Sequence, residues 1–249
     1  GAFRKNAFVS CHEKASGTGG FSFLGETSLP IYDDLNLIAG DDLDPYDLNK
    51  SLLGTSKVVP LRIRPGDDAS CLNLNKAIRP TLYGVSSEEV KGRFSFSDGD
   101  WSLLDIEIDE GVVPVVVDQN TMMWALKMKK GDRMEFLDGS GKPFFVELAA
   151  VVTGSILQGG LYMSEDRFLE KFPKQGGYRA FLIEEKPALE GQVAEHLEDR
   201  LSNYGMEFVS TAERLRALQK VENTYLSIFQ GLGGLGLLLG TAGLAVVVA

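Results

Sequence analysis

The feature that most constrains this chain is a long C-terminal stretch without charge. The last side chain that is charged at neutral pH is Glu222, so 249 − 222 = 27 residues carry no charge. A helix from Ser227 to Ala249 would be about 34 Å long at about 1.5 Å per residue, and a bilayer core requires about 20 apolar residues. A buried helix in a soluble core is the alternative, but such helices rarely run this long without a charge on a solvent face. We therefore predict a membrane span within residues 223–249. Its predicted membrane-spanning residues are Leu226, Phe229, Leu232, Leu235, Leu238, Leu239, Leu244 and Val247.

The charge balance and the cysteines exclude several classes of function. With 25 basic and 35 acidic residues the net charge is −10, and a field of that sign repels the phosphates of nucleic acids and anionic lipid headgroups. We expect no nucleic-acid partner. Cys11 and Cys71 are too few for a disulfide framework or a four-ligand zinc site. The pair could form a single disulfide in an oxidising compartment, and the sequence leaves their redox state open.

The first hundred residues show short strand patterns separated by turns. The acidic stretch 33–50 has the composition of a calcium loop but lacks the EF-hand order, so we expect a solvated loop or helix cap and no metal. Residues 57–64, KVVPLRIR, alternate as a half-buried strand does, and Pro60 indicates an edge or a bulge. Strands are expected over residues 7–11, 20–26, 57–64, 81–85 and 93–96.

The middle of the chain holds its most strongly β-forming segment. Residues 112–118, VVPVVVD, are a continuous β-branched run typical of a strand buried on both faces, which predicts a central strand. A β-rich part is expected to end near Pro173. Its other expected elements are a strand at 101–108, a helix from Asn120 or Thr121 to Lys129, a hairpin turned at 138–141, a strand at 161–164 and a short helix after Ser164.

From Tyr178 the pattern changes to strand, helix, strand and then a long helix. Thr211 is expected to cap a helix that contains no Pro or Gly before the apolar run. We call it the stalk helix, and its predicted face comprises Thr211, Leu215, Leu218 and Val221. We expect it to continue into the membrane as one rod. Because the sequence begins at Gly1 and stops inside the apolar run, we also expect a fragment of a longer protein, and the positive-inside rule cannot orient the span.

No pattern of catalytic chemistry stands out. The stretch Gly139-Ser140-Gly141-Lys142 is followed by Pro143 where a phosphate loop needs Ser or Thr, so it is read as a hairpin turn. There is no G-x-S-x-G motif, and the two histidines, His12 and His196, have no evident nucleophile beside them. We expect His196 to be a surface histidine among carboxylates. The sequence predicts no catalytic, metal-binding or cofactor-binding residues.

Three stretches resemble a known family. They are YGVSSEEVKGRFSF at 83–96, VVPVVVDQNTMMWALKMKKGDRMEF at 112–136 and NTYLSIFQGLGGLGLLLGTAGLAVVV at 223–248. In this order they resemble the MacB/FtsX-type permeases of ABC transporters, in which a Gly-Val-Ser turn leads to a Gly-Arg-Phe strand and a long helix begins the second membrane span. The likeness covers nearly the whole chain. The loop containing CLNLNKAIRP and the acidic region 33–50 depart from the family pattern.

The resemblance implies an α+β fold in four parts. Residues 1–60 would form the first part of a discontinuous α/β (βαβ-type) subdomain, 61–177 an inserted β-rich subdomain, 178–222 the second part of the α/β subdomain with the stalk helix, and 223–249 the start of a transmembrane helix. It also implies an extracytoplasmic domain at the inner membrane, a dimer of permease chains, contact with membrane lipid, an extracytoplasmic partner protein and a separate ATPase subunit that binds ATP. The domain itself would be no enzyme.

The implied function is to relay ATP-driven motion for export, lipoprotein release or a periplasmic partner. A membrane-anchored binding or sensor domain with one span and no ATPase is the main alternative. An anchored enzyme with a nonstandard site ranks last, because no nucleophile–base pair is visible.

Overall fold

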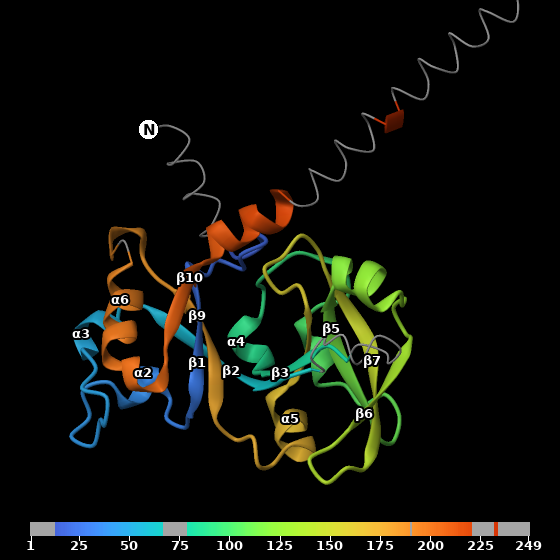
Figure 1. Ribbon diagram of the computed structural model, residues 1–249, viewed down its shortest axis with the longest axis horizontal. Coiled ribbons are helices and arrows are strands. Elements are labelled where there is room, and N and C mark those ends of the chain that lie inside the picture. Colours follow the sequence, from blue (N-terminus) through green and yellow to red (C-terminus); the bar gives the residue numbers. More distant parts are fainter. Residues whose placement is uncertain (1–12, 67–78, 190, 221–231, 234–249) are drawn as a thin grey trace, which may run out of the picture.

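The computed structural model describes residues 13–66, 79–189, 191–220 and 232–233 (Figure 1). The strands are β1 (Phe23–Ile31), β2 (Lys57–Arg64), β3 (Thr81–Val85), β4 (Phe96–Asp98), β5 (Val112–Asp118), β6 (Arg133–Leu137), β7 (Pro143–Val152), β8 (Gly160–Ser164), β9 (Tyr178–Glu184) and β10 (Glu207–Ser210). The α-helices are α2 (Leu35–Ile38), α3 (Lys50–Leu53), α4 (Ser87–Val90), α5 (Glu165–Lys171) and α6 (Gln192–Arg200). Short helical turns are η2 (Trp101–Leu104), η3 (Thr121–Leu126), η4 (Pro187–Leu189) and η5 (Ser202–Tyr204). Residues 211–220 are also helical.

The described strands form one ten-stranded sheet with two distinct parts. Strands β10-β1-β9-β2 run antiparallel to their neighbours, and β1 lies between the two strands of the β9–α6–β10 unit. We call these four strands and α2, α3 and α6 the terminal half. Beyond β2 the order continues β3-β8-β5-β7-β4, with β6 also paired to β7, and we call residues 65–177 the insert. The predicted α+β class, with a β-rich insert between the two parts of an α/β subdomain, is confirmed. The exact domain bounds stay a prediction.

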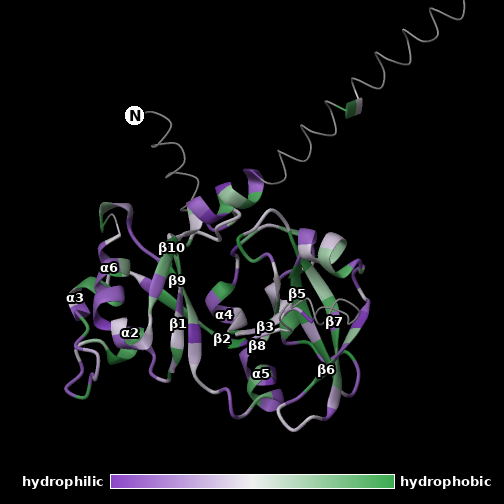
Figure 2. Ribbon diagram, viewed as in Figure 1, coloured by the Kyte–Doolittle hydropathy of each residue, from purple (hydrophilic) through white to green (hydrophobic). Residues whose placement is uncertain are grey.

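The described residues form three hydrophobic cores. One lies under the helices of the terminal half, one lies between the terminal half and the insert, and the third lies within the insert. Neighbouring residues of β2 and β9 enter different cores because successive strand side chains point to opposite faces. Val58 and Phe181 face the helices α2, α3 and α6, whereas Val59 and Leu182 face the insert. The core between the halves also contains Trp101, Val116 and Tyr162. The third core covers the far side of the insert strands and contains Val115, Val117, Phe144, Phe168 and Phe172. Figure 2 shows hydrophobic residues concentrated in β5 and β7 and hydrophilic residues on α6.

The central strand predicted at 112–118 is confirmed, and every residue of β5 is buried. Val113, Val115 and Val117 enter the third core, whereas Val116 enters the core between the halves, which explains why the strand is apolar on both faces. Two of the strand prolines, Pro60 and Pro114, stand where the strand has one hydrogen-bonded neighbour. Pro60 pairs only with β9, since the β2–β3 pairing starts at Arg62. Pro114 pairs only with β7, since the β5–β8 pairing covers Val116 and Val117. The missing N–H of proline therefore costs no ladder bond to a second strand.

Two predicted strands are wrong. Residues 101–108 contain the 3₁₀ turn η2, in which Trp101 and Leu104, three residues apart, are buried. Asp100 caps the turn by accepting a hydrogen bond from the Ser102 amide at 2.7 Å, so a local polar contact outweighs the alternating pattern. The strand expected at 93–96 instead covers Phe96–Asp98. Phe94 has φ 65°, a left-handed conformation that no strand accommodates.

One predicted helix is shorter in the structure, and the stalk helix is described only in part. The helix expected to reach Lys129 is the six-residue π-helical turn η3, and it ends at Lys127, whose φ is 54°. The described part of the stalk helix covers residues 211–220. Within the described part of the chain, no helix is both long enough and apolar enough to cross a bilayer. The predicted span at 223–249 lies outside the described residues, except for Leu232 and Gly233, which are helical.

Candidate functional site: the base of the stalk helix

The stalk helix begins on the first strand of the terminal half. The Thr211 side chain is fully buried, its Oγ1 lies 2.5 Å from the Phe21 carbonyl and 3.0 Å from the Ser22 carbonyl, and its amide donates to Ser22 O at 3.0 Å. Thr211 is therefore not the N-cap that the sequence predicted. Ser210 takes that position, because its Oγ accepts a hydrogen bond from the Glu213 amide three residues on at 3.4 Å. Thr211 instead fixes the first helical turn to the start of β1.

The next helical residues contact the insert. Arg214 donates from Nε to the carbonyl of Ile156 at 3.3 Å, and Leu215 packs against the core between the two halves. Ile156 belongs to the loop that joins β7 to β8, residues 153–159, which we call the clamp loop. The Ile156 amide donates to Gly17 O at 2.9 Å. A Cβ at Gly17 would lie 2.1 Å from Gly154 O and 3.0 Å from a Leu215 methyl group, so these three segments meet at van der Waals contact.

The clamp loop is held to the end of β5 by a buried carboxylate. Asp118 accepts hydrogen bonds from the Ser155 hydroxyl at 2.9 Å and from the Asn120 amide at 2.9 Å. Thr121 Oγ1 accepts from the Gly159 amide at 2.8 Å, which fixes the other end of the loop. Burial raises the pKa of Asp118, and the hydrogen bond from Ser155 opposes that shift. The loop that contacts the stalk helix is thus tied to the central strand of the insert.

A buried arginine adds a second connection between the halves. Arg93, which follows α4, donates from Nη1 to Gly19 O at 2.9 Å and forms an ion pair with Glu184 at the end of β9. Its guanidinium also lies 4.3 Å from the centre of the Phe21 ring. Arg93 of the insert therefore joins the segment before β1 to β9. It also contacts Phe21, the residue whose carbonyl accepts the hydrogen bond from Thr211.

A third connection lies where β2 passes from one part of the sheet to the other. Arg62 in β2 donates to Glu165 Oε1 of α5 from Nε at 2.9 Å and from Nη2 at 2.7 Å. Tyr178, the first residue of β9, donates to the same oxygen at 2.8 Å, and its ring lies 4.2 Å from the guanidinium carbon of Arg62. Burial and the bond to Glu165 raise the pKa of Tyr178 to about 12, so the phenol keeps its proton. We call these three residues the hinge triad.

The remaining predicted site residues lie in different places. Leu215 and Leu218 are half-buried on the stalk helix, whereas Val221 lies outside the described residues. Of the predicted membrane-spanning residues, Leu232 is described and is 62% exposed; the other seven lie outside the described part. Cys11 and Cys71 lie outside it too, so their disulfide stays a prediction. Sequence reasoning missed Gly17, Ile156 and Asp118, because their contacts involve backbone groups or residues far apart in the chain.

His196 has a structural contact instead of a chemical partner. Its Nε2 accepts a hydrogen bond from the Asn49 amide at 2.9 Å, which joins α6 to α3. Burial, and then the nearby Arg200 charge, lower the pKa of His196 and favour the neutral ring that can accept this bond. Among the described residues, no group of three or more His, Cys, Asp or Glu side chains is placed to hold a metal ion.

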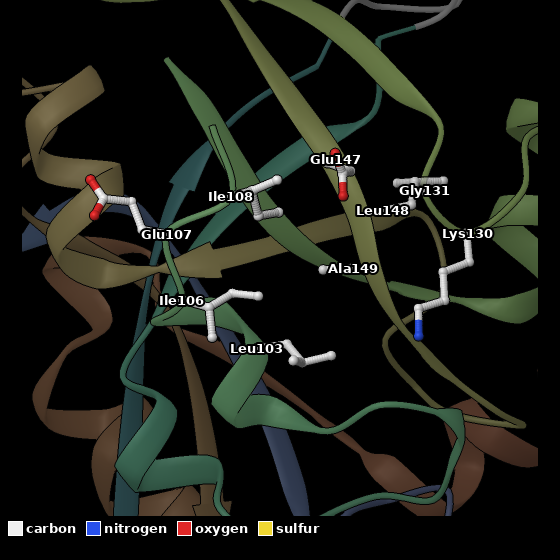
Figure 3. A pocket seen from close by; sticks show the side chains of 9 residues that line it. All are labelled: Leu103, Ile106, Glu107, Ile108, Lys130, Gly131, Glu147, Leu148 and Ala149. Atoms are coloured by element: carbon white, nitrogen blue, oxygen red, sulfur yellow. The ribbon is translucent and has the colours of Figure 1, made fainter. Parts of the chain in front are cut away.

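An open pocket lies on the insert, apart from the stalk helix. It has a volume of about 640 Å³ and forms where β4 and β6 leave a gap along β7 (Figure 3). Ala149, at the β-bulge between the paired residues of β5 and β7, lies in its floor, surrounded by Leu103, Ile106 and Ile108. The charged lining residues are Glu107, Lys130 and Glu147; Lys130 pairs with Asp98 at 2.6 Å and Glu147 with Arg133 at 2.8 Å. The described lining is thus mainly aliphatic.

Solved structures with similarity to this chain include domains of two transporters. The chain is similar to the periplasmic region of MacB from Actinobacillus actinomycetemcomitans, with 17% identity over 82% of this chain and 94% of that structure and a TM-score of 0.43. It is also similar to the extracellular domain of the noncanonic ABC-type transporter YknZ from Gram-positive bacteria, with 12% identity over 76% of this chain and 98% of that one and a TM-score of 0.37. MacB is a protein that the sequence resemblance names. No family model and no curated protein matches the chain.

Proposed function

We propose that this chain is the extracytoplasmic part of an ABC-type transporter permease, and that it transmits ATP-driven motion through the stalk helix. The observation that carries the proposal is the double attachment of that helix. Thr211 bonds to the start of β1 in the terminal half, and Arg214 bonds to the clamp loop of the insert. In the sequence, the uncharged segment 223–249 begins 223 − 211 = 12 residues after Thr211. A displacement of the helix therefore reaches both halves at its base.

The physical basis is the stiffness of a hydrogen-bonded helix. A continuous helix moves its two ends together, whereas a flexible linker absorbs the displacement. The proposal places residues 223–249 in the inner membrane, the described domain on its extracytoplasmic side, and ATP on a separate ATPase subunit. It further assigns the chain to a dimer of permease chains that contacts an extracytoplasmic partner. In this proposal the chain itself catalyses no reaction. The exported or released cargo is not specified by these residues.

Helix continuity is tested by paired insertions between Lys220 and Val221 in the full-length transporter. Seven flexible Gly/Ser residues should abolish the transport-dependent phenotype that the wild-type gene restores to a deletion strain, while ATP hydrolysis and folding persist. Seven Ala-rich helical residues are the matched control, because seven residues are close to two helical turns and keep both stiffness and phase. Equal activity of the two insertions would contradict the relay.

The ATPase partner is tested by affinity purification of the full-length membrane protein in a mild detergent. The proposal expects an ABC-type ATPase subunit in stoichiometric amounts by mass spectrometry. A chain that purifies without any ATPase would instead support a single-span sensor domain.

A further inference from the structure

The π-helical turn η3 exposes a tryptophan and a methionine to solvent. Trp124 is 73% exposed and Met123 is 46% exposed, although both are large apolar side chains. The second tryptophan of the chain, Trp101, is 3% exposed and lies in the core between the halves. Full exposure of a tryptophan leaves a large apolar area in water, which is costly unless that area meets another surface.

The turn is fixed in a conformation that directs these side chains outward. Met122 and Leu126, four residues apart, pack against the third core. Thr121 is buried and bonded to the clamp loop through Gly159, and Lys127 ends the turn with φ 54°. Because both ends and the inner face are held, Met123 and Trp124 between them cannot turn inward. Single π-helical turns of this kind are common at functional sites.

The residues around Trp124 are locally basic in an acidic chain. From Gln119 to Gly131 the sequence contains Lys127, Lys129 and Lys130 and no acidic residue, a local charge of +3 against −10 for the whole chain. All three lysines are exposed. Lys130 pairs with Asp98 at 2.6 Å, and the Lys129 amide bonds to Asp132. Within the described part of the chain, neither Lys127 nor Lys129 forms an ion pair.

The basic turn lies at the end of the molecule where the stalk helix leaves it. Figure 1 draws η3, in light green after β5, and the stalk helix, in orange-red, at the same end of the domain. The contacts agree, since Thr121 at the start of η3 holds the clamp loop and the clamp loop holds Arg214 of the stalk helix. The exposed aromatic Tyr32 follows the other end of β1, nine residues or about 30 Å of strand away from the Thr211 contact.

We infer that η3 is a lipid-contact site: Trp124 and Met123 insert into the headgroup region of an anionic bilayer, and Lys127 and Lys129 bind its phosphates. The inference rests on the proposed anchoring of residues 223–249 in that bilayer. Tryptophan favours the interface because its ring is apolar while its indole N–H is a donor, and lysines beside it are attracted to anionic headgroups. The overall negative charge repels such a surface, so the basic turn orients the domain with this end toward the membrane.

The two tryptophans make the contact directly measurable by fluorescence. The full chain is reconstituted into vesicles of phosphatidylcholine with phosphatidylglycerol, with or without bromine on the acyl chains. We expect brominated lipid to quench the exposed tryptophan and the bilayer to protect it from iodide. In Trp124→Phe both effects should vanish, because Trp101 is buried. Tyr32→Ala, which removes an equally exposed aromatic residue from the other end, should leave both effects unchanged.

The contribution of the lysine charges is tested with the double variant Lys127→Gln, Lys129→Gln. Quenching should weaken several-fold in anionic vesicles and approach the level seen in pure phosphatidylcholine vesicles. Resistance to alkaline extraction, measured on the same samples, reports the anchor separately. A chain that resists extraction while Trp124 stays open to iodide and unquenched would overturn the lipid contact and leave the anchor intact. Protection from iodide that appears only with an added protein, without quenching by lipid, would assign the surface to that protein. Extraction of the whole chain from the vesicles would overturn the anchor and this inference together.

Discussion

The hinge triad permits a quantitative test of how strongly the two parts of the sheet are coupled. Arg62→Met removes two charge-assisted hydrogen bonds to Glu165 from a side chain that is 9% exposed, while the Glu165 side chain is 24% exposed. Removing one partner of a fully buried pair costs about 3–5 kcal/mol. Water and the Tyr178 hydroxyl still reach Glu165 here, so we expect a loss of about 2–3 kcal/mol for Arg62→Met. For a chain of this size that lowers Tm by about 4–12 °C.

The assay is a double-mutant cycle in the full chain in a mild detergent. Thermal unfolding, followed by the fluorescence of buried Trp101, is measured for wild type, Arg62→Met, Glu165→Gln and the double variant. The expected coupling free energy is about 1.5–2 kcal/mol, since Arg62→Met removes both bonds and Glu165→Gln removes the carboxylate charge that strengthens them. The control cycle uses the exposed pair Lys91 and Glu88, whose side chains are 73% and 76% exposed, and should give about 0.2–0.5 kcal/mol. A coupling free energy between Arg62 and Glu165 no larger than this control would refute the conclusion that the hinge triad couples the two parts of the sheet.

Three further predictions concern the base of the stalk helix and the helices of the terminal half. Thr211→Val keeps the volume but leaves the Phe21 and Ser22 carbonyls without their hydroxyl donor, so it should cost about 1–2 kcal/mol in unfolding free energy by thermal unfolding. Ser155→Ala should cost about 1–3 kcal/mol at pH 7 and less at acidic pH, because a protonated Asp118 is the weaker acceptor. The folded-state pKa of His196 lies below 6.5, so its contribution to stability is present above that pH and is lost as the pH falls through the folded pKa. Unfolding measured between pH 7 and pH 5 should show this loss.

Each of these predictions has a control and a contrary result. Ser202→Ala, on an exposed turn of the terminal half, controls for the loss of a hydroxyl and should change Tm little. A Thr211→Val protein as stable as wild type would show that the helix base is held by packing alone. If the cost of Ser155→Ala did not vary with pH, the Asp118 carboxylate would not be the acceptor that matters. His196→Gln should reduce the loss of stability at acidic pH, and an unchanged pH profile in this variant would assign the loss to other groups.

The fold could be predicted from sequence where burial pattern and local geometry agree. Strand β2 at 57–64 and strand β3 at 81–85 have the predicted bounds. The failure at 101–108 has a local cause, since the Asp100 cap favours a 3₁₀ turn over an apolar alternation that is real but partly solvent-facing. The order of strands could not be predicted, because the parallel pairings of β3 with β8 and of β5 with β7 depend on contacts between residues far apart in the chain.

Of the candidate site at the base of the stalk helix, only the helix face could be predicted from the sequence. The apolar spacing of Thr211, Leu215 and Leu218 indicates the helix face that meets the domain, and the structure places Thr211 and Leu215 in that contact. The other side of the contact consists of main-chain atoms, such as Ile156 O, and of the absence of a side chain at Gly17. Neither leaves a periodic signal in the sequence. The three lysines of the basic turn at 127–130 are visible in the sequence, but the exposure of the turn is known only from the packing of Met122 and Leu126.

The division of β2 between two partners also determines how the domain unfolds. Residues 57–61 pair with β9 and residues 62–64 pair with β3, so one uninterrupted strand belongs to both hydrogen-bonded ladders. Denaturant cannot strip either ladder completely without fraying the strand that the other requires. The terminal half and the insert should therefore lose structure in a single cooperative transition, with similar amide-exchange protection in the β2–β9 and β2–β3 pairs. No proteolytic cut outside β2 would then release the insert as an independently folded body.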